Sequence, residues 1–455
     1  MQDIVGSIWW LIVSLGILVT FHEFGHYWVA RRCGVRVLRF SVGFGKPLWT
    51  RIGRDGTEYV VAALPLGGYV KMLDEREAEV PADQLDQAFN RKPLRQRVAI
   101  VAAGPIFNLL LCLLLLWGMF LVGKGDYQPL VGRADKIAAE AGFREGDRIL
   151  SVDGEAMQTW THVGMGLIGA ALDRRSVAVE VLDAEGNART RQLDLSRLPE
   201  GVKESALMPA IGLVPQQVLL APVIGEVSAG APAAQAGLQA GDRILGIDGQ
   251  RIASWDQVTP RVLEAAEAGR PARLSFERAG SIQEVTLTPA PNPEAQTNPQ
   301  APPFILGLRA QPASAPHDAV LRYGPIEAVA ASFRETWRLT TTTFGMLYRM
   351  VTGVASLQNL SGPISIAQYA NDSAQRGLAW FLFFLGVLSL SLCIMNLLPI
   401  PILDGGHLLY YLIEAIKGAP VSEKSLILGQ YVGLAMLGGL MALAFYNDIL
   451  RLFSS

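Results

Sequence analysis

The chain has 455 residues, of which 50% are hydrophobic and 18% are charged, and its mean hydropathy is +0.29. This composition is more apolar than that of an ordinary soluble protein. The formal net charge of −2 provides no basic excess, so we expect no nucleic-acid partner. The three cysteines lie far apart in or beside apolar segments, which argues against a disulfide framework and a cysteine metal site.

Four apolar segments are long enough to cross a bilayer as helices, which takes about 20 residues. They cover residues 4–30, 98–122, 377–403 and 425–446. No basic residue precedes the first segment and no small-residue cleavage site follows it. We therefore interpret it as a membrane span and not as a signal peptide. The sequence predicts an α-helical integral membrane protein.

Basic residues predict the orientation, because short loops rich in Lys and Arg stay in the cytoplasm. Four arginines follow the first span and four basic residues precede the second: Arg31, Arg32, Arg36, Arg39, Arg91, Lys92, Arg95 and Arg97. The loop between these spans is therefore expected to be cytoplasmic. The N-terminus and the region between spans two and three of this multi-pass protein are then expected outside, which means the periplasm if the membrane is the inner membrane of a bacterium.

The first span ends in the stretch His22-Glu23-Phe24-Gly25-His26, which has the pattern H-E-x-x-H. Residues i and i+4 share one face of a helix, so both imidazoles can bind one Zn²⁺ while the glutamate lies beside it as a base. A pair of packing histidines is the alternative. Ionisable residues within a membrane are costly and mark function, so we predict His22 and His26 as metal ligands and Glu23 as the catalytic base.

Two further features follow this motif in the chain, before the end of the second span. Residues 57–72 contain two β-prone runs around Pro65-Leu66-Gly67-Gly68, which predict a cytoplasmic-side β-hairpin. An exposed edge of it could pair with an unwound substrate. The second span contains Gly104-Pro105 and Asn108. Asn108 either faces the zinc cavity or is one tolerated polar residue near a kink, and both interpretations stay open.

The region between spans two and three contains a repeat. Residues 138–157 match residues 233–252 at 11 of 20 positions, at a constant offset of 95 (233 − 138 = 95). A period of this length predicts two copies of a small domain. After the repeat, residues 325–351 have apolar side chains at helical spacing with interspersed arginines. This helix is expected to lie on the membrane surface or to pack against the repeated domains.

The third span ends in "NLLPIPILDGGH", residues 396–407. Pro399 and Pro401 cannot both lie inside a regular helix, so the chain must open there, and open backbone at membrane depth has to line a cavity. A catalytic zinc usually has three protein ligands. Asp404 is the candidate for the third ligand, and His407 competes with it because imidazole also binds zinc.

H-E-x-x-H in a first span, combined with N-x-x-P-x-x-x-L-D-G in a later span, resembles the site-2 protease family of intramembrane metalloproteases. The repeated "GDRIL…DG" is similar to the PDZ domain. The resemblance implies that His22, His26 and Asp404 hold one Zn²⁺, with Glu23 catalytic and His407 in a supporting role. It also implies a substrate-binding role for Asn396, and we add Asn108, Pro399 and Pro401 as lower-ranked candidates.

The resulting expectation is a four-helix membrane protease with a β-hairpin element and two periplasmic α+β PDZ domains. The expected divisions are a membrane core at 1–123, PDZ domains at 124–220 and 221–312, an amphipathic segment at 313–376 and a second core part at 377–455. The expected partners are the lipid bilayer and transmembrane substrates, namely an anti-sigma factor and remnant signal peptides. The PDZ domains either recognise pre-trimmed substrates or act as a steric gate, and the protein is expected to be a monomer.

Two other functional classes explain the sequence less completely. Ligands at mid-membrane depth would also suit a zinc transporter, but transport does not explain Glu23, the peptide-binding domains or the single metal set. A PDZ scaffold without activity does not explain the complete ligand set and its base.

Overall fold

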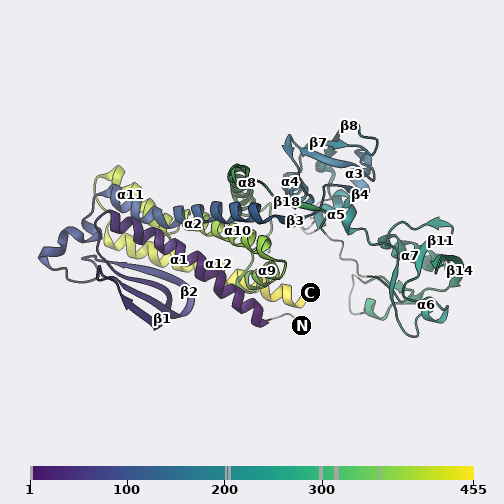
Figure 1. Ribbon diagram of the computed structural model, residues 1–455, viewed down its shortest axis with the longest axis horizontal. Helices are drawn as coiled ribbons and strands as arrows, with labels where there is room; N and C mark the ends of the chain where they lie inside the picture. The colour runs from purple at the N-terminus through teal and green to yellow at the C-terminus, as the bar shows by residue number, and fades with distance from the viewer. Residues whose placement is uncertain are drawn as a thin grey trace. The chain divides into compact units, whose positions relative to one another are not determined.

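The computed structural model describes residues 4–199, 202, 206–296, 301–311, 317–357 and 360–454. The chain divides into two compact units, Met1–Gly125 with Val320–Ser455, and Asp126–Ala319 (Figure 1). Within its described residues, the first unit has four helices long and apolar enough to cross a membrane, which confirms the four predicted spans. They are α1 (Ile4–Arg32), α2 (Leu94–Val122), α10 (Leu378–Leu397) and α12 (Glu423–Ser454). The predicted boundary at 312/313 lies outside the described residues.

Helix α2 is the centre of the membrane unit, because both α1 and α10 pack against it. Lipid tails are as apolar as leucine, so small side chains and interhelical hydrogen bonds decide such contacts. Gly25 of α1 lies so close to α2 that a Cβ there would meet the Ala103 carbonyl. On the other side, the hydroxyl of Ser389 in α10 donates to the backbone carbonyl of Asn108 at 2.7 Å. α2 is therefore fixed on two sides.

A sheet formed by β1 (Val37–Ile52) and β2 (Glu58–Met72) lies beside α1. Val37 pairs with Met72 and Val42 with Gly68, while Ile52 pairs with Glu58, so the two long strands pair along both halves. The hairpin predicted within residues 57–72 is wrong in its pairing. Both runs of β2 pair with β1 and not with each other, because the glycine-rich bend at Gly43 and Gly45, with φ of 93° and 87°, brings β1 alongside them.

The third span is shorter than predicted. Helix α10 ends at Leu397 and not at residue 403, and tight turns carry the chain to α11 (Asp404–Lys417). Pro399 and Pro401 account for the break, since proline removes a backbone donor and clashes with the preceding turn. Gly405 and Gly406 start α11 in close contact with the carbonyls of Leu397 and Ile400, where a Cβ would not fit.

Two more helices, α8 (Pro325–Val351) and α9 (Pro363–Gln375), complete the membrane unit. α8 has the predicted bounds and packs on α2 through small and polar buried residues, among them Ala331, Ser332 and Thr336. Several of its large apolar side chains face outwards, with Phe333 59% and Trp337 71% exposed. This exposed face fits the interpretation of a helix against the membrane, and α2 supplies its packing partner.

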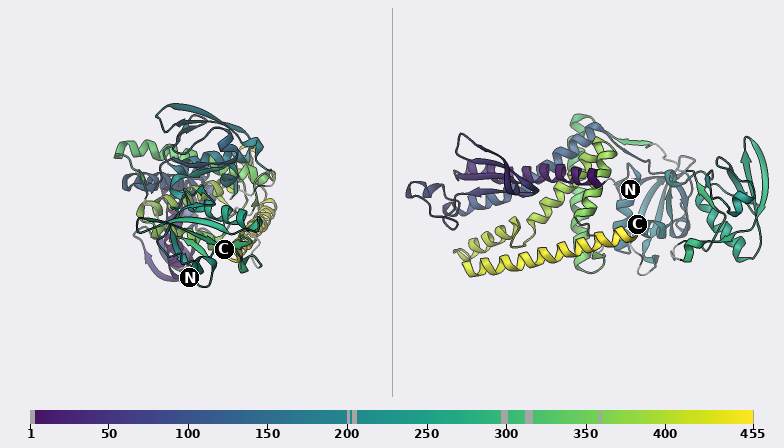
Figure 2. Two further views of the ribbon diagram at one scale, coloured as in Figure 1. Left: turned by 90° about the vertical axis from the view of Figure 1, so that its right-hand side faces the viewer. Right: turned by 90° about the horizontal axis from the view of Figure 1, so that it is seen from below.

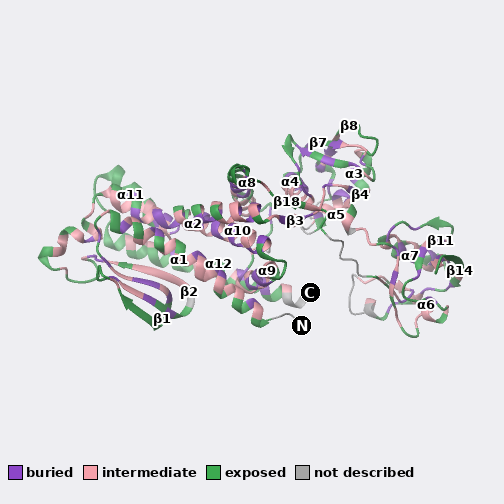
Figure 3. Ribbon diagram, viewed as in Figure 1, coloured by how far each residue is buried: buried purple, intermediate pink, exposed green. Residues whose placement is uncertain are grey.

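Helix α12 is exposed along most of its length (Figure 3), and it is yellow in the right-hand view of Figure 2. Polar residues near its C-terminal end attach it to the start of α9 and to the segment before it. The carboxylate of Asp448 accepts hydrogen bonds from the backbone N–H groups of Gly362, Ile364 and Ser365, which caps the N-terminus of α9. Asn447 donates to the carbonyl of Leu357 at 2.8 Å.

The second unit contains two similar parts, as the repeat predicts. The first has a four-stranded sheet in the order β6-β5-β7-β8, a pair β4-β9 and, among its described residues, three α-helices. Its elements are β4 (Val131–Ala134), α3 (Lys136–Glu140), β5 (Arg148–Val152), β6 (Glu155–Ala156), α4 (Trp160–Leu172), β7 (Ser176–Leu182), β8 (Ala188–Asp194), α5 (Leu207–Ile211) and β9 (Leu213–Pro215). Buried residues run through its sheet, as at β7 in Figure 3.

The second part has the corresponding sheet in the order β12-β11-β13-β14 and the pairs β10-β17 and β15-β16. Its elements are β10 (Ile224–Val227), α6 (Pro232–Gln235), β11 (Arg243–Ile247), β12 (Gln250–Arg251), α7 (Val258–Glu267), β13 (Ala272–Arg278), β14 (Ser281–Leu287), β15 (Ala290–Pro291), β16 (Phe304–Ile305) and β17 (Leu308–Ala310). The chain enters the unit through β3 (Lys124–Asp126) and leaves it through β18 (Ala319–Leu321).

The repeated Gly-Asp pairs have a structural reason. The buried carboxylate of Asp242 accepts a hydrogen bond from the backbone N–H of Gln239, and Asp147 does the same for Arg144. Burial raises the pKa of the Asp242 carboxyl, but bonds from the Arg278 guanidinium at 2.6 and 2.7 Å outweigh it and hold the pKa below its ordinary value. The repeated motif thus closes a turn in each copy.

Candidate active site

The two histidines of the H-E-x-x-H motif lie in the C-terminal half of α1 and share one face of the helix. Their Nε2 atoms are 3.2 Å apart, and their side chains are only 14% and 12% exposed for His22 and His26. One helical turn separates them, as the i, i+4 spacing predicts. Two imidazole nitrogens are therefore directed at one point.

Asp404 reaches the same point from the first residue of α11, 378 positions after His26 (404 − 26 = 378). Its Oδ2 atom lies 3.2 Å from His22 Nε2 and 3.5 Å from His26 Nε2. This oxygen is buried and accepts no hydrogen bond. Among the described residues, His22, His26 and Asp404 are the one group of three or more His, Cys, Asp or Glu whose ligand atoms meet at metal-binding distances.

The three atoms fit a zinc ion. Ligands about 2.0–2.2 Å from one zinc at tetrahedral angles lie about 3.3–3.6 Å from each other. The three separations here, 3.2, 3.2 and 3.5 Å, are close to that range. Two imidazoles and a carboxylate also form the type of three-ligand set that leaves a fourth position open in catalytic zinc sites. The unpartnered Asp404 oxygen is explained by the same ion.

Groups on helix α2 orient both imidazoles through contacts with their Nδ1 atoms. The Nδ1 atom of His26 lies 2.8 Å from the carbonyl oxygen of Ile100, which makes Nδ1 the protonated nitrogen and leaves Nε2 free to bind a metal. The side-chain amide of Asn108, fully buried, lies 3.2 Å from the Nδ1 atom of His22. The amide atom at this distance is the nitrogen Nδ2, and the amide oxygen has no hydrogen-bond partner. A metal-bound His22 needs an acceptor at Nδ1, and turning the Asn108 amide by 180° would place its oxygen there.

Two glycines make this approach possible. A Cβ on Gly104 of α2 would collide with both imidazole rings, and a Cβ on Gly25 of α1 would collide with Ala103 and Phe107 of α2. The sequence reasoning treated Gly104 as part of a kink and missed its contact with the histidines. The Ile100 carbonyl was missed as well, because a backbone acceptor leaves no trace in the identity of its residue.

The site opens into a cavity of about 400 Å³. Glu23, His26 and Asp404 line one part of it, and Val70 of β2 lies beside them. The backbone of Val70 lies close enough to the Glu23 carboxylate to interact with it electrostatically. The predicted base therefore shares one cavity with two of the predicted ligands and contacts the edge of the sheet.

The other predicted residues have different positions. His407 lines the cavity but lies outside the three-residue group, so the geometry favours Asp404 in the choice between them. Asn396 is half-buried on the last turn of α10 and Pro399 is exposed, and neither lines the cavity. Pro401 packs close to Gly406 of α11 and to Gly429 and Gly433 of α12.

Comparison with known proteins identifies the family. The sequence model of Peptidase family M50 matches residues 10–440. The chain belongs to Peptidase family M50. Regulator of sigma-E protease RseP of Escherichia coli (strain K12) is 42% identical over 444 residues, which cover 97% of this chain and 98% of the relative. Protease RseP of Yersinia pestis is 41% identical over 454 residues, 99% of this chain and all of the relative. A protein of Xylella fastidiosa (strain Temecula1 / ATCC 700964), named for zinc metalloprotease activity, is 49% identical over 451 residues, 99% of this chain and all of the relative.

This M50 peptidase is therefore a zinc metalloendopeptidase of the site-2 type, as the two membrane motifs predict. Zinc is its cofactor. The similarity to proteases named RseP extends over the whole chain, so it includes the region of the two repeats as well as the membrane helices. The alternative interpretations as a transporter or an inactive scaffold are set aside by the family.

Proposed function

We propose that this M50 peptidase hydrolyses peptide bonds in the transmembrane segments of other proteins. The observation that carries the proposal is the convergence of His22, Asp404 and His26, with Glu23 next to them, on helices of a four-span unit. In this proposal His22, His26 and Asp404 hold the zinc, and Glu23 is the catalytic base. The site would lie at membrane depth towards the cytoplasmic side of the bacterial inner membrane.

Zinc, when bound, lowers the pKa of a water molecule towards about 7 and polarises a peptide carbonyl. The protein groups supply the rest. Glu23 lines the cavity and follows His22 directly in α1, so its carboxylate can take the proton of the attacking water. The same carboxylate then passes the proton to the nitrogen of the leaving amine. The cavity supplies room for water at a depth where lipid would exclude it.

A transmembrane substrate must unwind before it can be cleaved, because its amide bonds are hidden in helical hydrogen bonds. The second half of β2 offers a binding edge for the unwound segment. One side of Gly68–Met72 pairs with β1, and its other side faces Glu23 near Val70. Adding an extended substrate to this edge would present its backbone to the zinc site, which is the mode of β-strand addition.

The two repeated parts are proposed to be PDZ domains that recognise or gate substrates already trimmed outside the membrane. The second copy offers a cavity of about 240 Å³ between α7 and β17, lined by Val258, Val262, Gly307 and Arg309. Gly307 has a φ of 80°, and it stands in the apolar-Gly-apolar stretch "ILGLR". This arrangement suits a peptide terminus beside a helix, so recognition is favoured over a purely steric gate for this copy.

The proposed substrates are a membrane-bound anti-sigma factor and remnant signal peptides. The names of the relatives as regulators of sigma-E support the first of these. The proposed orientation places the N-terminus and both repeats in the periplasm, as the basic residues around the first loop predict. We propose that the protein acts as a monomer in the bilayer.

The ligand set is tested by measuring bound zinc and cleavage of a model transmembrane substrate for Asp404→Ala and His407→Ala. Asp404→Ala is expected to lose both zinc and cleavage, whereas His407→Ala is expected to keep its zinc. Full zinc occupancy in Asp404→Ala, or loss of zinc in His407→Ala alone, would contradict the proposed ligand set. Folding of each variant is checked by its elution as a single species in detergent.

A further inference from the structure

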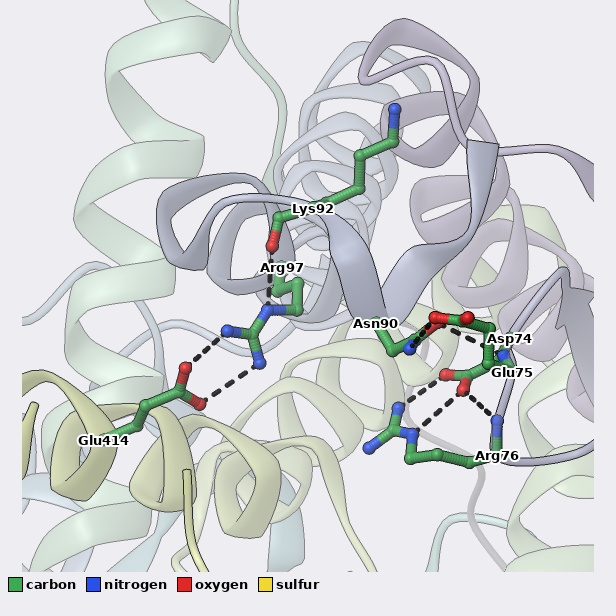
Figure 4. Close-up of polar contacts among 7 residues, drawn as sticks. All are labelled: Asp74, Glu75, Arg76, Asn90, Lys92, Arg97 and Glu414. Carbon is green, nitrogen blue, oxygen red and sulfur yellow. Dashed lines mark hydrogen bonds and ion pairs between the residues drawn. The ribbon is translucent and has the colours of Figure 1, made fainter. Parts of the chain in front are cut away.

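A largely buried ion pair between Arg97 and Glu414 joins α2 to α11, and both residues line the cavity (Figure 4). The guanidinium of Arg97 donates two parallel hydrogen bonds to the carboxylate of Glu414, at 2.5 and 3.1 Å. The two side chains are only 14% and 15% exposed. A bidentate pair of this kind fixes both distance and angle between the elements that carry it.

Arg97 is held on its other sides too. Its Nε atom donates to the carbonyl of Lys92 at 3.1 Å, and its guanidinium lies 5.1 Å from the centre of the Tyr411 ring, which is 9% exposed. Tyr411 and Glu414 are three positions apart and share one face of α11. Arg97 therefore contacts one face of α11 in two ways, through its ion pair with Glu414 and through the plane of its guanidinium against the Tyr411 ring.

The same stretch of α2 supports the histidines. Ile100, whose carbonyl orients His26, lies three positions after Arg97 (100 − 97 = 3), and Gly104 faces both imidazoles one turn further on. Asp404 is the first residue of α11, ten positions before Glu414 (414 − 404 = 10), or about 15 Å along the helix. α2 is thus the common support of all three proposed ligands.

We propose that Arg97 is a positioning residue for the zinc centre. Its ion pair with Glu414 sets how α11 lies along α2, and so sets where Asp404 meets the two histidines. The proposal rests on Asp404 being a zinc ligand, as argued above. It adds an interaction that holds the third ligand, which comes from a different helix and follows the break in the chain between α10 and α11.

A polar contact is needed to fix the position of α11 along α2, because both helices belong to the membrane unit. Apolar side chains of two helices in a membrane gain little by choosing one alignment over another, whereas a bidentate charged pair has one good geometry. The neighbouring pair Arg76–Asp74 also lines the cavity, but its partners are two positions apart in one loop and join no separate elements (Figure 4). Arg97–Glu414 is the pair that bridges the supports of the ligands.

The test measures zinc affinity by competition with a chelator for Glu414→Gln and Arg97→Lys, in the full-length protein in detergent. Glu414→Gln keeps the volume and removes the charge, and Arg97→Lys keeps the charge and removes the fork. Both are expected to bind zinc at least tenfold more weakly and to shift the visible spectrum of the cobalt-loaded protein. A merely structural pair would lower the melting temperature and leave both readouts of the folded protein unchanged.

Glu75→Gln is the matched control, because Glu75 accepts two bonds from Arg91 at 2.7 and 3.0 Å in a pair that does not reach α11. Parent-like zinc affinity in either Glu414→Gln or Arg97→Lys would overturn the proposal, as would an equal loss in Glu75→Gln. Asp404→Ala separates the two levels of the argument. If it keeps zinc, the proposed ligand set fails, and if it alone loses zinc, only the positioning role fails.

Discussion

Replacing Asn108 by leucine tests whether a hydrogen bond from a buried side chain to His22 strengthens zinc binding. Asn108 is fully buried, and its amide lies 3.2 Å from Nδ1 of His22. Leucine has a similar volume but no acceptor, so the Nδ1–H of a metal-bound His22 would be left unpaired. An unpaired buried donor costs about 1–3 kcal/mol, and the loss of such an outer partner weakens metal binding by about 10–100-fold.

The assay is zinc affinity by chelator competition, followed by cleavage at saturating zinc. Asn108→Asp should bind zinc nearly as well as the parent, because a carboxylate also accepts from Nδ1–H. Ser389→Ala serves as a packing control, since Ser389 bonds only the backbone carbonyl of Asn108. The reasoning is refuted if Asn108→Leu binds zinc within about twofold of the parent, or if Asn108→Asp loses as much as Asn108→Leu.

Three more outcomes are expected. Gly104→Ala should displace the histidines and weaken zinc binding by more than about tenfold, whereas Gly118→Ala on the same helix, whose Cβ meets only Leu382 at 3.6 Å, should not. Arg278→Met should lower the stability of the second repeat at pH 7, measured by tryptophan fluorescence during unfolding. In the parent, the lowered pKa of the Asp242 carboxyl stabilises the fold above about pH 4, and this stabilisation is lost in acid. The difference in unfolding free energy between the parent and Arg278→Met should therefore shrink below about pH 4, and a constant difference would contradict this reasoning. Two Leu→Gly changes beside the scissile bond of a helical substrate remove about 1.5 kcal/mol of helix stability. If the substrate must unwind, cleavage should become up to about tenfold faster, and slower cleavage would argue against unwinding.

The membrane architecture and the proposed ligands could be predicted from sequence because they depend on strong local signals. A run of about 20 apolar residues has few other fates than a span. The spacing of His22 and His26 is a helical constraint, and Pro399 and Pro401 require the break that places Asp404 at a helix start. The choice between Asp404 and His407 needed the resemblance, since both residues follow the same break.

The parts that escaped prediction depend on which segments meet in space. Both runs of residues 57–72 have strand character, but their common partner β1 is set by the bend at Gly43 and Gly45. The role of Gly104 follows from the approach of α1, which no local pattern reports. The pair Arg97–Glu414 joins residues 317 positions apart, and in the sequence Arg97 was only one of eight basic residues that indicate orientation.

The central claim is that Glu23 acts as a base beside a zinc held by His22, His26 and Asp404. Glu23→Gln has the same shape and cannot take a proton, so it tests the claim most directly. Zinc content and cleavage of a transmembrane substrate are measured on the same purified sample. We expect one zinc per chain, as in the parent, and cleavage slowed by at least about 10²-fold. Cleavage at the parent rate with zinc in place would contradict the account.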